Sequence, residues 1–230
     1  MAELFDDYRT SYQDVVADSI SFSGLKHDFF MQAKADLIER RLRSEGYLAP
    51  EMKRHALDIG CGIGTMHPYI RDLFSNVDGC DVSAESIERA RRDNPNVGYR
   101  AYSGKQLPYP DESFDFAMTV CVVHHVPPPE WPCFFSEMRR ILRPGALACV
   151  IEHNPLNPVT RLAVLRCPFD EDAVLLRSST TRRLLAAAGF TSISHEFFCL
   201  LPSAGRVARR VERTMSNFPV GAQYACFARA

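Results

Sequence analysis

Three glycines at alternate positions, 60, 62 and 64, constrain the fold of this chain more than any other feature. They follow a short apolar run at residues 56–59, which predicts a buried strand. Such close spacing predicts a tight turn that approaches a ligand, because a side chain there would collide with it. Apolar residues at helical spacing after Thr65 predict a helix that begins at the turn. Its N-terminus would offer unpaired backbone N–H groups and a positive dipole end to a polar ligand.

Two nucleotide-type cofactors fit a glycine turn of this kind. The dinucleotide fingerprint needs its third glycine three positions after the second, which here is Thr65, whereas this chain has Gly64. With Asp58 two positions before the first glycine, the pattern G-x-G-x-G resembles motif I of class I S-adenosylmethionine-dependent methyltransferases. The resemblance is to the small-molecule, type 11-like enzymes, and it implies S-adenosylmethionine as cofactor. It places Asp58, Gly60, Gly62 and Gly64 at the cofactor; a turn that serves packing only is the alternative.

An acidic residue follows the next predicted strand. Residues 77–80 form that strand, and Asp81 lies 17 residues after Gly64. A carboxylate in this position accepts hydrogen bonds from both hydroxyls of a ribose in the dinucleotide fold. The family resemblance assigns Asp81 this role and places Val82 beside it. Asp81 could instead cap the helix predicted at 84–92, but Ser83 is already a candidate cap.

The adenine end of the cofactor is predicted from a third segment. Residues 103–109, with the sequence S-G-K-Q-L-P-Y, and Ser113-Phe114-Asp115 resemble the adenine-contacting segment of the family. Ser103 takes the position that is usually acidic, so a hydroxyl replaces a carboxylate there. Gly104 could bring its backbone N–H to the ring. We also place Cys121, near the end of the strand predicted at 114–123, among the cofactor-binding residues.

The order of predicted elements indicates the fold. The resemblance implies an α/β, Rossmann-like class I methyltransferase fold whose seven-stranded, mostly parallel sheet has an antiparallel last strand. We expect an N-terminal helical cap over residues 1–53 and a methyltransferase domain over 54–230, with an acceptor-side insertion at about 154–178. The expected strands are 56–59, 77–80, 97–102, 114–123, 146–151, 190–200 and 223–229; the expected helices include 29–42, 84–92, 130–142 and 180–188.

Polar residues at two strand ends are the candidates for catalysis. Methyl transfer from a sulfonium is a direct displacement, so alignment of the reactants supplies much of the rate and a general base is optional. Histidine suits that base because it titrates near neutrality. We predict His153 as the base, with His125 as the alternative. The predicted acceptor contacts are Tyr8, Tyr12, His124, Glu152 and Asn154.

Charge and composition exclude several classes. A formal net charge of −1 gives no general attraction to nucleic acid or to an anionic membrane. No apolar run reaches the roughly 18 residues of a membrane span, and no signal pattern begins the chain, so we expect a cytoplasmic protein with no membrane partner. The eight cysteines form no C-x-x-C pair, so we expect reduced thiols. Catechol-type enzymes carry aspartates where this chain has His-His and Glu-His-Asn, so we expect no magnesium site and no other metal.

The predicted function is transfer of a methyl group from S-adenosylmethionine to an oxygen or nitrogen atom of a small metabolite or a sugar-containing acceptor. Two alternatives stay open: a regulatory module that binds the cofactor without catalysis, and a nicotinamide-dependent oxidoreductase. The sequence leaves the acceptor and the oligomeric state open.

Overall fold

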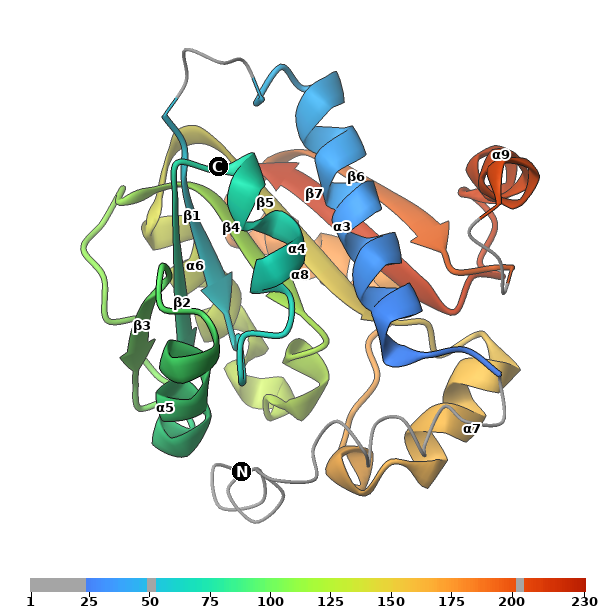
Figure 1. The fold of residues 1–230 in the computed structure, drawn as a ribbon, viewed down its shortest axis with the longest axis horizontal. Coiled ribbons are helices and arrows are strands. Elements are labelled where there is room, and N and C mark those ends of the chain that lie inside the picture. The colour runs from blue at the N-terminus through green and yellow to red at the C-terminus, as the bar shows by residue number, and fades with distance from the viewer. Residues whose placement is uncertain (1–23, 49–52, 202–204) are drawn as a thin grey trace.

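The computed structural model describes residues 24–48, 53–201 and 205–230, and it shows one seven-stranded sheet (Figure 1). The strand order is β3-β2-β1-β4-β5-β7-β6, and β7 runs antiparallel to both of its neighbours. The predicted fold, with its antiparallel last strand, is therefore confirmed. The strands are β1 His55–Ile59, β2 Asn76–Asp81, β3 Gly98–Ala101, β4 Phe114–Val120, β5 Leu142–His153, β6 Thr191–Phe198 and β7 Gln223–Arg229.

Helices cover both faces of the sheet. In the view of Figure 1, α3 and α4 cross in front of the strands and α6 and α8 lie behind them. Among the described residues, no helix combines the length and the apolar character that a membrane crossing requires. The helices are α3 His27–Ser44, α4 His67–Ile70, α5 Ala84–Asp93, α6 Trp131–Arg140, α7 Pro158–Arg166, α8 Ser178–Ala187 and α9 Arg206–Met215, and short 3₁₀ turns include Val123–His125 and Pro168–Asp170.

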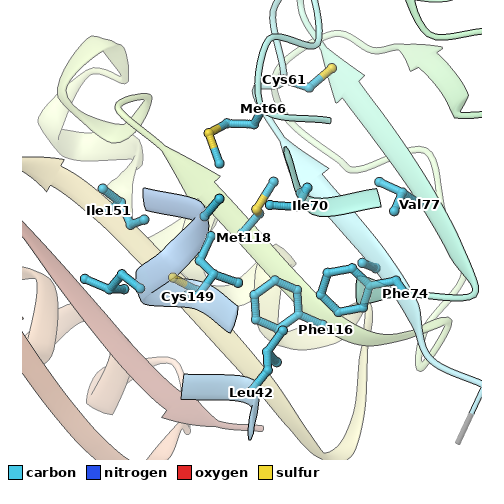
Figure 2. Packing of buried hydrophobic residues seen from close by; sticks show 14 of the residues in the cluster. Leu42, Cys61, Met66, Ile70, Phe74, Val77, Phe116, Met118, Cys149 and Ile151 are labelled. Carbon is cyan, nitrogen blue, oxygen red and sulfur yellow. The ribbon is translucent and has the colours of Figure 1, made fainter. Parts of the chain in front are cut away.

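The front core joins α3 to the sheet. Figure 2 shows Leu42 of α3 beside Phe116 of β4, and Met118 of β4 beside Ile70 of α4, within one cluster of buried residues. The rings of Phe74 and Phe116 are stacked, with centroids 5.1 Å apart. Alternate residues of β4 face opposite sides, so Ala117 belongs to the rear core, as expected for a strand buried on both faces. The described part of the predicted cap is thus packed into the same core as the sheet.

The helix after the glycine turn is shorter than predicted. The periodicity from Thr65 to Phe74 indicated a continuous helix, but α4 has four residues and gives way to a 3₁₀ turn at Arg71–Leu73. The helical path breaks at Ile70, whose φ is −120°, and Phe74 is already extended as the chain approaches β2. Aligned peptide dipoles add up only over a longer helix, so the predicted positive helix end contributes little here.

Residues that begin or end a helix were better predictors elsewhere in the chain. Ser83 caps α5, because its side chain accepts a hydrogen bond from Ser86 N, and Gly189 follows α8 with a φ of +89°. Strand β5 begins at Leu142, before the expected start at 146, and Gly145 within it has a φ of +78°. All eight cysteines are unpaired, and four of them are buried.

Candidate active site

A cavity of about 620 Å³ opens at the carboxyl ends of β1, β2, β4 and β5, where open α/β sheets bind ligands. Helices α3 and α7 supply its other walls. The cavity brings together most of the residues predicted from the sequence. Those on its wall are Asp58, Gly60, Gly62, Asp81, Val82, Ser103, Gly104, Cys121, His124, His125 and His153.

The glycine turn makes room for a ligand at Gly62. An added Cβ at Gly62 would meet no atom within 4 Å, so this position opens toward the cavity. At Gly60 the same atom would lie 2.5 Å from the Val122 side chain. Gly64 does not line the cavity, because its Cβ would meet the Tyr99 hydroxyl at 2.5 Å.

The backbone donors of the turn differ from the prediction. The N–H groups of Gly60 and Cys61 both bond to Cys80 O, and Gly64 N bonds to Cys61 O. These groups hold the turn against β2, and they are not the unpaired donors that the sequence suggested. The turn therefore contributes a shape that only glycine permits at Gly60 and Gly62.

Asp81 is held in place by backbone donors. Its Oδ2 accepts a hydrogen bond from Gly62 N at 2.8 Å, and its Oδ1 accepts one from Ser83 N at 2.9 Å. Burial raises the pKa of Asp81, and these two backbone hydrogen bonds oppose that rise. Each oxygen keeps a further lone pair, so the carboxylate can still accept hydrogen bonds from a ligand.

Asp58 lies beneath the glycine turn with one oxygen unsatisfied. The residue is 3% exposed, and its Oδ1 has no hydrogen-bond partner among the described residues. Its Oδ2 lies 3.1 Å from His67 Nε2, and His67 Nδ1 bonds to the hydroxyl of Tyr99. A buried carboxylate oxygen without a donor is costly, so the geometry calls for a donor from a ligand.

His124 lies between two carboxylates at the far side of the cavity. Its Nδ1 is 2.5 Å from Glu152 Oε2, and its Nε2 is 3.4 Å from Asp170 Oδ1. Burial lowers the pKa of His124, but Glu152 and Asp170 outweigh burial and raise the pKa to about 10. Without another cation, His124 is therefore an imidazolium that neutralises one of the two carboxylates.

Glu152 and Asn154 support the site from behind. Glu152 is fully buried, and its Oε1 accepts hydrogen bonds from Val122 N and Val123 N. Asn154 donates to the carbonyl oxygens of Pro219 and Gly221. Neither side chain lines the cavity, so the expected direct contact with an acceptor is corrected to a supporting role. The other expected contacts, Tyr8 and Tyr12, lie outside the described residues.

His153 and His125 present neutral imidazoles to the cavity. Burial and the charge of His124 lower the pKa of each to about 4. The ring of His153 lies 5.2 Å from that of His124, centroid to centroid. His153 lines the cavity and Glu152 does not, although both side chains lie close to His124.

Several polar residues on the cavity wall were not predicted, among them Asp170, Gln223 and Lys34. Asp170 comes from the 3₁₀ turn Pro168–Asp170, which the sequence showed only as part of an insertion; the neighbouring buried Phe169 was the available signal. Gln223 pairs in register with His153, and its Oε1 is buried without a partner among the described residues. Lys34 of α3 is 5% exposed and forms no ion pair within the described part of the chain.

Cys121 has an unusual backbone conformation for a non-glycine residue. Its φ is +57°, immediately after β4, and its Sγ accepts a hydrogen bond from Gln223 Nε2 at 3.5 Å. Left-handed residues of this kind cost free energy and are found often at functional sites.

Comparisons with known proteins agree with this geometry. Residues 57–150 match the family described as a methyltransferase domain. An uncharacterized methyltransferase of Synechocystis sp. is 28% identical over 155 residues, which are 66% of this chain and 73% of that protein. The 27-O-demethylrifamycin SV methyltransferase of Amycolatopsis mediterranei is 33% identical over 141 residues, or 56% of this chain and 50% of that protein. A solved SAM-dependent methyltransferase of Thermotoga maritima aligns over 100% of this chain and 99% of its own, with a TM-score of 0.68 and 21% identity.

The sheet order and the cavity at its carboxyl edge define a Rossmann-like fold of the methyltransferase type. Together with the family match over residues 57–150, they support a class I S-adenosylmethionine-dependent methyltransferase. The unsatisfied Asp58 oxygen and the open position at Gly62 fit this cofactor, which carries a cationic amino group.

Proposed function

We propose that the enzyme transfers a methyl group from S-adenosylmethionine to an oxygen or nitrogen atom of a small-molecule acceptor. The observation that carries the proposal is one continuous cavity, walled by the glycine turn and Asp81 on one side and by the histidines of β4 and β5 on the other. Its volume of about 620 Å³ lies within the usual range of small-molecule sites. Two relatives support a small acceptor by their names: a ubiquinone biosynthesis O-methyltransferase and the 27-O-demethylrifamycin SV methyltransferase.

The cofactor would lie along the first half of this cavity. Asp81 would accept hydrogen bonds from the ribose hydroxyls, and Ser103 and Gly104 would lie beside the adenine. Asp58 Oδ1 would accept a hydrogen bond from the amino group. When bound, the cofactor supplies a methyl group that is already activated for displacement.

His153 would act on the acceptor in the second half of the cavity. Its imidazole lies at the end of β5 and lines the cavity, in reach of a hydroxyl or amine that approaches over Cys121. It would accept the proton that the acceptor loses as its oxygen or nitrogen binds the methyl carbon. His125 is the second candidate for this role. The helices α3 and α7 would exclude water from the reacting atoms.

The test is to incubate the purified enzyme with S-adenosylmethionine and a fractionated metabolite extract. Mass detection should find a product heavier by one methyl group and a matching amount of S-adenosylhomocysteine. A protein that binds S-adenosylhomocysteine but forms no product with any fraction would be the regulatory module instead. Binding of NADH without binding of S-adenosylhomocysteine would contradict the cofactor assignment itself.

A further inference from the structure

Three metal-ligating side chains converge at the acceptor end of the cavity. His124 and His125 come from the 3₁₀ turn after β4, and Asp170 comes from the 3₁₀ turn after α7. The two imidazole Nε2 atoms lie 3.4 and 3.5 Å from the same carboxylate oxygen, Asp170 Oδ1. One atom from each residue lies within 4.8 Å of the other two, and all three residues line the cavity.

The spacing of these atoms matches a metal site better than a hydrogen-bonded cluster. Charge-assisted hydrogen bonds between nitrogen and oxygen are about 2.7–2.9 Å long, which is shorter than both distances to Asp170. In a tetrahedral site with bonds of about 2.0–2.1 Å, neighbouring ligand atoms lie roughly 3.3–3.5 Å apart. Both observed distances are therefore those of a tetrahedral edge.

The surroundings of His124 add a second, independent observation. Glu152 accepts a hydrogen bond from Nδ1 of His124 at 2.5 Å, so the imidazole turns its Nε2 toward Asp170 and the cavity. Two backbone N–H groups, from Val122 and Val123, fix the carboxylate of Glu152. Metal-bound histidines are commonly oriented in this way by a carboxylate behind them.

Charge at the cluster also calls for a cation. Glu152 and Asp170 place two carboxylates around one imidazole in a buried setting. A divalent ion bound between Nε2 of His124 and Asp170 would supply the positive charge that a proton on His124 otherwise supplies. Buried carboxylates are stable only when such a charge accompanies them.

We infer that His124, His125 and Asp170 bind one divalent transition-metal ion, with a fourth coordination position open to the cavity. Two imidazole nitrogens and one carboxylate oxygen suit Zn²⁺ and its first-row neighbours, whereas Mg²⁺ prefers an all-oxygen set. The expectation of no magnesium site is compatible with this inference, but the broader expectation of no metal is not. The inference is independent of the proposed function, because metal binding by these side chains is tested without cofactor or acceptor.

Zinc binding tests the inference directly. The protein is prepared with the exposed Cys133 changed to serine, treated with a chelator and titrated with Zn²⁺ by calorimetry. We expect one site with a dissociation constant of about 1 µM or tighter. Co²⁺ in place of Zn²⁺ should give the visible absorption bands of a tetrahedral ion.

Ligand variants locate the site. Asp170→Asn and His125→Ala should each weaken Zn²⁺ binding by about 100-fold or more, and Glu152→Gln should weaken it roughly 10- to 100-fold because His124 loses its orientation. His195→Ala, on β6 and away from the cavity wall, should leave binding unchanged. Circular dichroism verifies that each variant is folded.

Two results would overturn the inference. One is a folded wild-type protein that binds no Zn²⁺, in which case the cluster is an ion pair only. The other is binding that survives both His125→Ala and Asp170→Asn, which would place the ion elsewhere. Calorimetry with S-adenosylhomocysteine on the chelated protein separates these outcomes from the proposed function, because cofactor binding should persist without the metal.

Discussion

Asp81 has both carboxylate oxygens fixed by backbone donors and still faces the cavity. Asp81→Ala should weaken binding of S-adenosylhomocysteine by roughly 30- to 150-fold in calorimetry, because a charged acceptor of hydrogen bonds contributes about 2–3 kcal/mol. Asp72→Ala, which alters an exposed carboxylate away from the cavity, is the control and should change nothing. Affinity within about threefold of wild type in Asp81→Ala would exclude the ribose role.

His153 is the residue on which the proposed proton transfer depends. His153→Ala should lower kcat by about 10²–10⁴ and leave the affinity for S-adenosylhomocysteine within about threefold. His195→Ala is the matched control because it removes an imidazole outside the cavity. If His153→Ala keeps more than about a third of the wild-type kcat, then either His125 is the general base or alignment of the reactants suffices without a base.

Lys34 gives a prediction about stability. Its ammonium is almost fully buried with no ion pair in the described residues, and burial of an unpaired charge costs free energy. Lys34→Met should therefore keep or raise the free energy of unfolding of the ligand-free protein, by up to about 1 kcal/mol in urea denaturation. Lys53→Met, at an exposed position, should change it by less than about 0.5 kcal/mol. A loss above 1 kcal/mol for Lys34→Met would instead show that the ammonium has a stabilising partner.

At the scale of elements, α3 is both a core helix and a wall of the cavity. Its Ile38 is fully buried in the front core, while Phe30, Met31 and Lys34 line the cavity. Ile38→Ala should lower the free energy of unfolding by about 2–5 kcal/mol in urea denaturation, through lost burial and the void left behind. Gln32→Ala, on the exposed face of α3, should change it by about 0.5 kcal/mol or less. A loss below 1 kcal/mol in Ile38→Ala would mean that α3 is loosely docked.

The helices and strands also show how much of the fold could be predicted from the sequence. Parallel strands are buried on both faces and read as apolar runs, so β1 and β4 were found within a few residues of their bounds. The antiparallel β7 is buried along nearly its whole length, and it was found in the same way. The glycines and the predicted strand ends identified residues that line the cavity, because strand ends can be recognised from local sequence. The predicted length of the helix after the turn was wrong, because periodicity does not reveal where the chain must leave the helix to enter β2.

The residues at the acceptor end of the cavity could not be predicted in this way. Asp170, Gln223 and Lys34 come from three distant segments, and only packing brings them to the histidines. The pairing of Gln223 with His153 depends on the register of β5 and β7, which neither strand specifies by itself. Glu152 was assigned to the acceptor because it ends a strand, but its side chain turns inward to His124.

At the scale of the whole molecule, the cavity wall draws on segments from α3 near the start of the described chain to β7 at its end. A ligand that contacts all of them should stabilise the fold as a unit, because it binds only when these segments are assembled. The strand order supports this coupling, since β1 and β4, which carry the two halves of the site, are paired neighbours at the centre of the sheet.

The expected size of this effect follows from linkage. S-adenosylhomocysteine at 100 times its dissociation constant should add about 2.7 kcal/mol to the free energy of unfolding. For a protein of this length, that is a rise in Tm of roughly 5–11 °C, measured by scanning calorimetry. Asp81→Ala at the same ligand concentration should show less than about half of the rise, and NADH should produce none. A rise with NADH equal to that with S-adenosylhomocysteine would mean that the cavity does not distinguish the two nucleotide cofactors, and the argument from Gly64 against nicotinamide binding would fail.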